Sequence, residues 1–237
     1  MRTDTTHFWE LEGGKNIMEI SVAIDGPAGA GKSTIAKIIG EKFNLMYINT
    51  GAMYRAVTLK AMNANVSESN VDELIRIVES LEMHFEEDHL FVNKEDLTDM
   101  INMPVISNNV SRYAAVPEIR EILVKLQQNI AKKFNVVMDG RDIGTVVLAD
   151  APFKFYLTAS SEERAKRRYE ELTSKGIEVD FNTILSEIEK RDYIDTHREV
   201  TPLIKADDAI EIDSSALDIN GVVETIVGYI NSKTCTN

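Results

Sequence analysis

Short apolar runs alternate along the sequence with longer stretches whose apolar residues recur every three or four positions. The short runs predict buried strands, at 20–24, 45–49, 136–138, 153–157 and 209–213. The longer stretches predict amphipathic helices, of which the most regular lie at 34–40, 50–61, 117–134, 181–196 and 219–230. Strands that alternate with helices over short connections predict an α/β fold with a parallel sheet and right-handed crossovers.

Residues 83–92 follow a different pattern from the rest of the chain. Their apolar and polar positions alternate on both sides of an acidic turn, Glu86-Glu87-Asp88, which is typical of a β-hairpin. An antiparallel piece inside a parallel pattern predicts an inserted subdomain of about residues 63–105.

Two of the predicted helices carry clear start signals. Pro117 stands in the first turn of one helix, whose apolar face runs from Ile119 to Phe134. Ser160, with Glu163 three residues later, forms a capping box for an arginine-rich helix.

A glycine-rich segment follows the first predicted strand and opens the first helix. It matches the phosphate-binding loop pattern at every fixed position and reads Gly26-Pro27-Ala28-Gly29-Ala30-Gly31-Lys32-Ser33, with Thr34 next. Glycines let the backbone turn tightly with its N–H groups directed inward, and the helix N-terminus adds a positive dipole. We expect Lys32 to reach the β- and γ-phosphates and the Ser33 hydroxyl to hold Mg²⁺. The strand and helix around the loop disfavour a coincidental glycine turn, so the sequence predicts binding of a nucleoside triphosphate.

Composition and charge narrow the partners and the compartment. The chain has 237 residues and a formal charge of −13, which argues against a nucleic-acid polymer because phosphate backbones need a basic surface. A small nucleotide stays possible, since a local arginine cluster can bind it inside an acidic protein. The single cysteine, Cys235, favours a reducing cytoplasm. No apolar run approaches the ~20 residues of a membrane span.

The first 17 residues lack both apolar periodicity and the apolar core of a signal peptide. We expect residues 1–17 to be a poorly ordered extension, and Met18 could be the native start.

Arginines cluster on two predicted helices near the C-terminal end of the sequence. Arg164, Arg167 and Arg168 lie on one helical face, and Arg191, Asp195 and Arg198 share a face of the next helix. One interpretation is a pair of solvated helices with surface salt bridges to the neighbouring glutamates. The other is a lid that brings positive charge to a phosphoryl group in transfer.

Several motifs beyond the loop occur together in a fixed order. They are Thr50-Gly51-Ala52-Met53-Tyr54-Arg55, Gly140-Arg141-Asp142-Ile143-Gly144-Thr145-Val146-Val147, Arg164-Ala165 with Arg167-Arg168, and Arg191-Asp192 with Asp195 and Arg198. With them, residues 19–230 closely resemble the bacterial cytidylate kinases, which are nucleoside-monophosphate kinases. The resemblance implies a three-layer α/β/α P-loop fold. Its core would be 18–62, 106–160 and 197–237, its acceptor-binding insert 63–105 and its lid 161–196.

The resemblance also implies the ligands and the residues that hold them. ATP would be the phosphoryl donor with Mg²⁺, CMP and dCMP the acceptors, and the protein a monomer. Catalysis would use Lys32, Arg141, Arg164 and Arg168. The implied CMP-binding residues are Arg55 and Arg141 at the phosphate, Ser111, Arg120 and Asp142 at the cytosine, Asp195 at the ribose, Arg198 near the phosphates, and Thr50. Asp139 is either a carboxylate beside the Mg²⁺ held by Ser33 or a turn former at a strand end.

Three positions depart from the family's usual residues, namely Asn49 for aspartate, Ala149 for proline and Asn102 for arginine. Asn102 lies at the edge of the insert, which puts in doubt a phosphate contact there.

Two other functions remain open at this point. One is a P-loop kinase for another acceptor such as UMP, and the other is a regulatory nucleotide-binding module.

Overall fold

The computed structural model describes residues 20–234, so the expectation for residues 1–17 and the position of Cys235 lie outside the described part. The strands are β1 (Ser21–Asp25), β2 (Met46–Asn49), β3 (Met83–Glu86), β4 (His89–Val92), β5 (Glu95–Asp96), β6 (Val136–Gly140), β7 (Phe153–Thr158) and β8 (Ile210–Asp213). The helices are α1 (Lys32–Phe43), α2 (Thr50–Asn63), α3 (Val71–Glu79), α4 (Thr98–Ile101), α5 (Pro104–Ala114), α6 (Pro117–Ala131), α7 (Ser161–Ser174), α8 (Phe181–His197) and α9 (Ile219–Thr234). A single π-helical turn, η1 (Ile143–Val147), follows β6.

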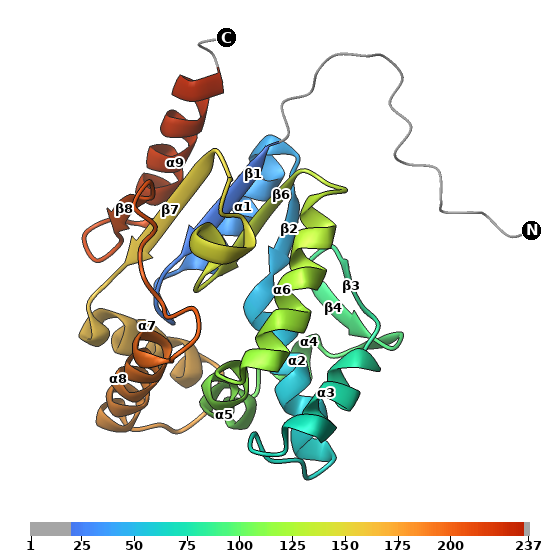
Figure 1. Ribbon diagram of the computed structural model, residues 1–237. Coiled ribbons are helices and arrows are strands. Elements are labelled where there is room, and N and C mark those ends of the chain that lie inside the picture. Colours follow the sequence, from blue (N-terminus) through green and yellow to red (C-terminus); the bar gives the residue numbers. More distant parts are fainter. Residues whose placement is uncertain (1–19, 235–237) are drawn as a thin grey trace, which may run out of the picture.

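The central sheet has five strands in the order β2-β6-β1-β7-β8, and every neighbouring pair is parallel. β1 lies in the middle, between β6 and β7, so the segment that follows it emerges at the centre of one sheet edge (Figure 1). This confirms the predicted α/β fold with a parallel sheet.

Helices cover both faces of the sheet, because successive strand side chains point to opposite sides and both sides are apolar. Val22 and Ile24 face α1 and α9 on one side. Ala23 faces the other side, where the core includes residues of α2, α3 and α6. Figure 1 shows α6 running across the front of the sheet. The result is the three-layer α/β/α arrangement.

The predicted hairpin is present, since β3 and β4 pair antiparallel from Met83–Val92 to Glu86–His89. A short third strand, β5, which the sequence did not predict, extends this small sheet. The expected boundary between insert and core at 105/106 falls inside α5. The division into core, insert and lid stays a prediction.

α7 and α8 pack against each other around a small apolar cluster of their own, with Ala165, Leu172 and Ile184 at its centre. The Ser160 side chain accepts a hydrogen bond from the backbone N–H of Glu163, which confirms one half of the predicted capping box. The other half is wrong, because the Ser160 N–H donates to Ser215 Oγ at 3.3 Å and the Glu163 carboxylate accepts from Arg167. In Figure 1 this pair lies away from the sheet and beside α5.

The predicted end of one helix is wrong. The helix that starts at Pro117 ends at Ala131, so Phe134 is not on its apolar face and is 41% exposed. The chain has to leave the helix at Ala131, because β6 already starts at Val136, five residues later. Among residues 20–234, no helix combines the length and the apolar character needed to cross a membrane.

Candidate active site

A cavity opens where β1, β2 and β6 end, at the carboxyl edge of the parallel sheet, which is the usual place for ligands in such folds. Charged side chains dominate its lining: Lys32, Arg55, Arg120, Arg141, Arg191, Arg198, Asp139, Asp142 and Asp195. Six basic groups face three carboxylates, so the lining carries a formal excess of three positive charges. The chain as a whole carries −13, which makes this cavity a local cationic site in an acidic protein.

The glycine loop forms one wall of the cavity and depends on its glycines for shape. Gly26 has a φ of +145°, and a Cβ there would lie 1.9 Å from the carbonyl oxygen of Leu157. Gly31, the cap of α1, has a φ of 90° in the left-handed region. Ala28, Gly29, Lys32 and Ser33 line the cavity, whereas Gly26, Pro27, Ala30, Gly31 and Thr34 shape the turn without lining it.

Lys32 is buried at the start of α1 and points back along the loop. Its Nζ donates to the carbonyl oxygen of Pro27 at 2.7 Å. Burial, followed by repulsion from Arg141, holds the pKa of Lys32 well below its usual value. An anion beside this ammonium group would relieve both effects.

Ser33 and Asp139 form an oxygen-rich corner next to the loop. Ser33 Oγ donates to Asp139 Oδ2 at 2.9 Å, and Tyr47 Oη donates to Asp139 Oδ1 at 2.8 Å. Asp139 lies inside β6, so it is not the turn former that one interpretation expected. A hydroxyl and a carboxylate are the ligand types that Mg²⁺ takes when phosphates and water complete its shell.

A second group of charges lies at the end of the cavity nearest α6. Arg120 Nη2 forms a buried ion pair with Asp142 Oδ2, and its Nη1 donates to the carbonyl oxygen of Ala114 at 3.0 Å. Arg198 Nη2 is 3.6 Å from Asp142 Oδ1. The Arg120 guanidinium also lies over the Tyr54 ring, 5.3 Å from its centroid. Arg198 therefore belongs with Asp142 and Arg120, rather than with the phosphate side of the cavity.

A third group centres on Asp195 of α8. Arg141 Nε donates to Asp195 Oδ2 at 2.9 Å, and Ser111 Oγ donates to Asp195 Oδ1 at 3.0 Å. Burial opposes ionisation of Asp195, but attraction to Arg141 and Arg191 outweighs it and lowers the pKa of the carboxyl group. Thr50, by contrast, uses its hydroxyl to bind the carbonyl oxygen of Asp139 at 2.8 Å.

Several buried polar atoms around the cavity make no hydrogen bond within residues 20–234. They are Tyr54 Oη, Arg55 Nε, Arg191 Nε and Arg198 Nη2. Burial lowers the pKa of Arg55, and burial followed by repulsion from Arg141 lowers the pKa of Arg191 to about 10. Buried donors and crowded cations are costly unless a ligand satisfies them. The arrangement fits an anion with several acceptor oxygens.

The three arginines of α7 have separate surroundings and none of them lines the cavity. Arg164 is buried, donates from Nη1 to the loop carbonyl of Ala28 at 3.1 Å and pairs with Asp192 at 2.6 Å. Arg167 donates to the carbonyl oxygen of Ser214 at 2.6 Å. Arg168 pairs with Glu171 at 2.8 Å near the surface. The interpretation as solvated helices with surface salt bridges therefore fits Arg168. It does not fit Arg164, which contacts the phosphate-binding loop directly.

The predicted site left out seven residues that line the cavity: Asn49, Gly51, Tyr54, Val110, Ala114, Gly140 and Arg191. Arg191 lies one helical turn before Asp195, so its helical spacing could have assigned it to the site. Of the unusual positions, Asn49 caps α2 by accepting from the N–H of Ala52 at 2.9 Å. Asn102 is exposed, is not part of the lining, and donates to the carbonyl oxygen of Thr98 at 2.8 Å.

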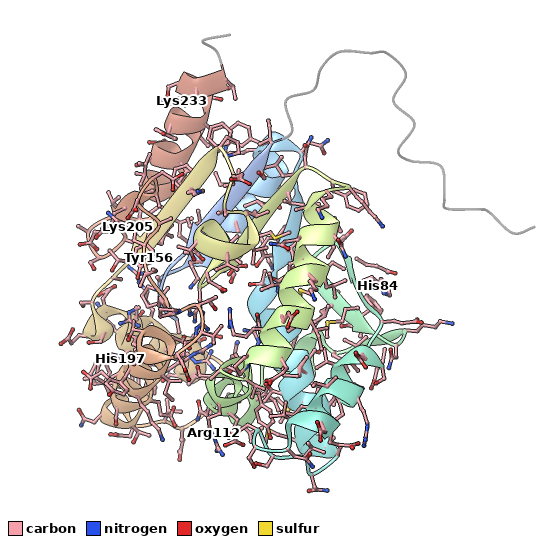
Figure 2. The ribbon with its side chains drawn as sticks, viewed as in Figure 1. His84, Arg112, Tyr156, His197, Lys205 and Lys233 are labelled. Carbon is pink, nitrogen blue, oxygen red and sulfur yellow. The ribbon has the colours of Figure 1, made fainter. Side chains whose placement is uncertain are left out.

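Arg112 and Lys205, which do not line the cavity, lie at the surface. Arg112 forms a surface ion pair with Glu68, and Lys205 pairs with Glu211 at 3.0 Å. Figure 2 shows both labelled side chains at the periphery of the molecule. The gathering of arginines in the cavity is therefore not a general property of this surface.

Comparison with known proteins gives consistent results. A family model described as cytidylate kinase matches residues 22–232. A cytidylate kinase from Clostridium perfringens strain SM101 is 64% identical over 211 residues, which are 89% of this chain and 97% of that protein. One from Clostridium acetobutylicum is 62% identical over 216 residues, covering 91% of this chain and all of that protein. A solved structure of an uncharacterized protein from Eubacterium ventriosum has a TM-score of 0.50 at 18% identity, covering 90% of this chain and 99% of that one, and is similar in fold alone.

Proposed function

This chain belongs to the cytidylate kinase family, and on that premise we propose that ATP binds at residues 26–34 and CMP binds in the cavity beside them. The enzyme transfers the γ-phosphate of ATP to CMP, which gives ADP and CDP. The observation that carries the proposed placement is the buried cationic lining next to the phosphate-binding loop.

On the donor side, the loop N–H groups and Lys32 hold the triphosphate. Lys32 exchanges its contact with the Pro27 carbonyl oxygen for the β- and γ-phosphate oxygens. Arg164 supports this wall of the site through its bond to the Ala28 carbonyl oxygen.

Ser33 and Asp139 are the residues that would hold Mg²⁺, and their hydroxyl and carboxylate oxygens suit that ion. Bound Mg²⁺ would offset the negative charge on the β- and γ-phosphate oxygens. Tyr47 keeps Asp139 in place through its hydrogen bond to Oδ1.

On the acceptor side, Arg55, Arg141 and Arg191 bind the CMP phosphate. The Nε atoms of Arg55 and Arg191 favour this assignment, since each is a buried donor that makes no hydrogen bond within residues 20–234; Arg191 Nε has only the 3.9 Å ion pair with Asp195 Oδ2. The Arg141 guanidinium and the Ser111 hydroxyl both donate to the Asp195 carboxylate, and we assign Asp195 to the ribose hydroxyls. Thr50 supports the same wall through its bond to β6.

Asp142 and Arg120 read the cytosine, with Ser111 and Arg198 beside them. Cytosine offers an N4 amino donor, which the Asp142 carboxylate can accept, and N3 and O2 acceptors, which suit the donor-only Arg120. Uracil would oppose its O4 to the carboxylate and its N3–H to the guanidinium. Each such mismatch in a closed site costs about 1–3 kcal/mol.

The reaction needs no general base, because the attacking oxygen of the CMP phosphate is already ionised near neutral pH. Catalysis consists of alignment, worth up to ~7–11 kcal/mol, and of stabilising charge on the transferring group. Lys32 and Arg141 both line the cavity, and we assign them to the transferring phosphoryl group, with Arg164 and Arg168 acting from α7. The Arg168 charge already influences the pKa of Arg55, after burial and closer charges.

The remaining assignments are finer. We propose that dCMP is also accepted, that no nucleic-acid polymer or membrane takes part, and that the enzyme works in the cytoplasm with its magnesium-bound ATP. We also propose that the enzyme is active as a monomer. Light scattering on the purified protein tests the last point, and a dimer at assay concentration would contradict it.

An acceptor screen tests the proposal. ADP release is coupled to a spectroscopic readout, with CMP, dCMP, UMP, AMP and GMP offered separately at equal ATP and Mg²⁺. We expect the highest kcat/KM for CMP, a comparable value for dCMP, and values at least about 10-fold lower for the others. A higher value for UMP would favour the kinase with another acceptor. ATP hydrolysis without any acceptor dependence would favour a regulatory module.

A further inference from the structure

Asp25 is a buried carboxylate that none of the proposed roles uses. It is the last residue of β1, stands directly before Gly26, and is 4% exposed. Its Oδ1 accepts from the backbone N–H of Ile143 at 2.8 Å, and its Oδ2 accepts from that of Gly144 at 2.7 Å. Burial raises the pKa of Asp25 to about 6, although the two backbone bonds oppose this. A costly buried charge that serves only backbone N–H groups calls for a physical reason.

The two N–H groups belong to the first turn of η1, where backbone donors have no partner within the turn. Asp142 directly precedes η1, but its side chain makes no capping hydrogen bond. Its carboxylate instead pairs with Arg120 and lies near Arg198 in the cavity. Asp25 thus satisfies two donors of this first turn from β1, while the Asp142 carboxylate lines the cavity.

Gly144 allows this close approach. A Cβ at Gly144 would lie 3.3 Å from Asp25 Oδ2 and 3.3 Å from Lys154 Cδ, tighter than ordinary contacts. Lys154 holds the far end of the same segment, since its Nζ donates to the carbonyl oxygen of Ala149 at 2.5 Å and to Asp208. Gln128 Nε2 also donates to the carbonyl oxygen of Val146 in the middle of the segment, at 3.2 Å. Of these three contacts, the one from Asp25 lies next to the cavity-lining residues Arg141 and Asp142.

We propose that Asp25 is a positioning residue that fixes Arg141 and Asp142 relative to the phosphate-binding loop through the backbone amides of Ile143 and Gly144. Since β1 runs from Asp25 directly into the loop, the donor loop and the acceptor-reading segment are held by one strand end. Small errors in the separation of two reactants lower the rate of transfer strongly. The inference rests on the proposed placement of CMP at Arg141 and Asp142.

The test replaces Asp25 by asparagine, which keeps one acceptor oxygen and places an amide N–H₂ opposite a backbone N–H. In Asp25→Asn we expect the KM for CMP to rise about 10-fold or more, because a buried hydrogen bond is lost. The CMP/UMP ratio of kcat/KM should narrow. The Kd for ATP, measured by calorimetry without CMP, should stay within about threefold, because Asp25 makes no hydrogen bond to the residues that would hold ATP.

Lys154→Met is the matched control at the far end of the segment. It should lower the melting temperature without changing the CMP/UMP ratio. Gly144→Ala is the second variant if Asp25→Asn does not fold, because it crowds the same carboxylate by only a few tenths of an ångström, and it should narrow the ratio too.

Folded Asp25→Asn and Gly144→Ala proteins that keep the wild-type CMP KM and ratio would overturn the role of Asp25. The same shift in Lys154→Met would overturn it as well, because any loosening of the segment would then suffice. A wild-type protein with no preference for CMP would instead overturn the proposed function on which this role depends.

Discussion

The donor loop and the acceptor cavity lie next to each other but are built in different ways. The loop is one continuous stretch, residues 26–34, whose shape depends on its glycines and which would hold a phosphate mainly through backbone N–H groups. The cavity is formed by side chains from α2, α5, α6, α8 and the segment after β6.

This difference has energetic consequences. In the cavity every carboxylate is held by cations or donors from other elements, as Arg141 and Ser111 hold Asp195. Removing one partner leaves a buried charge uncompensated, so binding and stability change together. The Lys32 ammonium group donates its hydrogen bond to a carbonyl oxygen of its own loop and lies among both cations and carboxylates, so its loss should affect chemistry much more than folding. Variants can test whether activity and stability change independently in the loop and together in the cavity.

The largest effect is expected for Lys32→Ala. The substitution removes a charge that meets the β- and γ-phosphates, so kcat should fall by about 10³-fold while the melting temperature changes little. Lys37→Ala is the matched control on the same helix, since Lys37 is exposed and pairs with Asp88. A folded Lys32→Ala enzyme with more than a tenth of normal turnover would contradict the assignment of the loop.

Asp195→Asn should change both properties at once. Arg141 and Arg191 lose their common counter-charge, and we expect kcat/KM for CMP to fall by about 10²-fold and the free energy of unfolding by about 3 kcal/mol. Glu187→Gln on the same helix is the control, because Glu187 is exposed and binds only Asn108. Loss of activity with unchanged stability would mean that the cavity is no more coupled to folding than the loop.

Protonation of the buried Asp25 carboxylate should make the free energy of unfolding depend on pH. Its folded pKa of about 6 lies above the unfolded value of 3.8, so its protonation favours the folded state. The stabilisation of the folded state by protonated Asp25 is fully present below pH 3.8 and is lost as pH rises through 6. The free energy of unfolding falls by about 3 kcal/mol over this range. Denaturant unfolding of wild type and Asp25→Asn between pH 4 and 7 measures the difference. A constant difference over that range would show that burial does not raise this pKa.

The smallest effect is expected for Arg168→Ala. Arg168 pairs with Glu171 at the surface and must leave that pair to reach the transferring group. We expect kcat to fall by about 10-fold while the KM for CMP is unchanged, because the charge acts mainly on the transition state. Lys166→Ala, on the same helix, should leave both constants unchanged. A rise in the KM for CMP alone would place Arg168 on the acceptor side.

Sequence patterns were sufficient where structure is local. The loop, the parallel sheet, the hairpin and the Ser160 cap each follow from short-range rules about glycine, strand periodicity and capping. The cavity does not, because Ser111, Arg120 and Asp142 come together only through folding. Neither η1 nor its contact with Asp25 has a local signal, since the two partners are separated by more than 100 residues. Only resemblance to a family brought the cavity residues together before the structure did.

The role of Asp142 in selecting cytosine is the central claim about the cavity. We would measure kcat/KM for CMP and for UMP with wild type and Asp142→Asn, using the exposed Asp150→Asn as control. An amide can turn to present either a donor or an acceptor, so the account predicts that the CMP/UMP ratio narrows by about 10-fold or more in Asp142→Asn. An unchanged ratio would contradict it, because Asp142 would then not face the base.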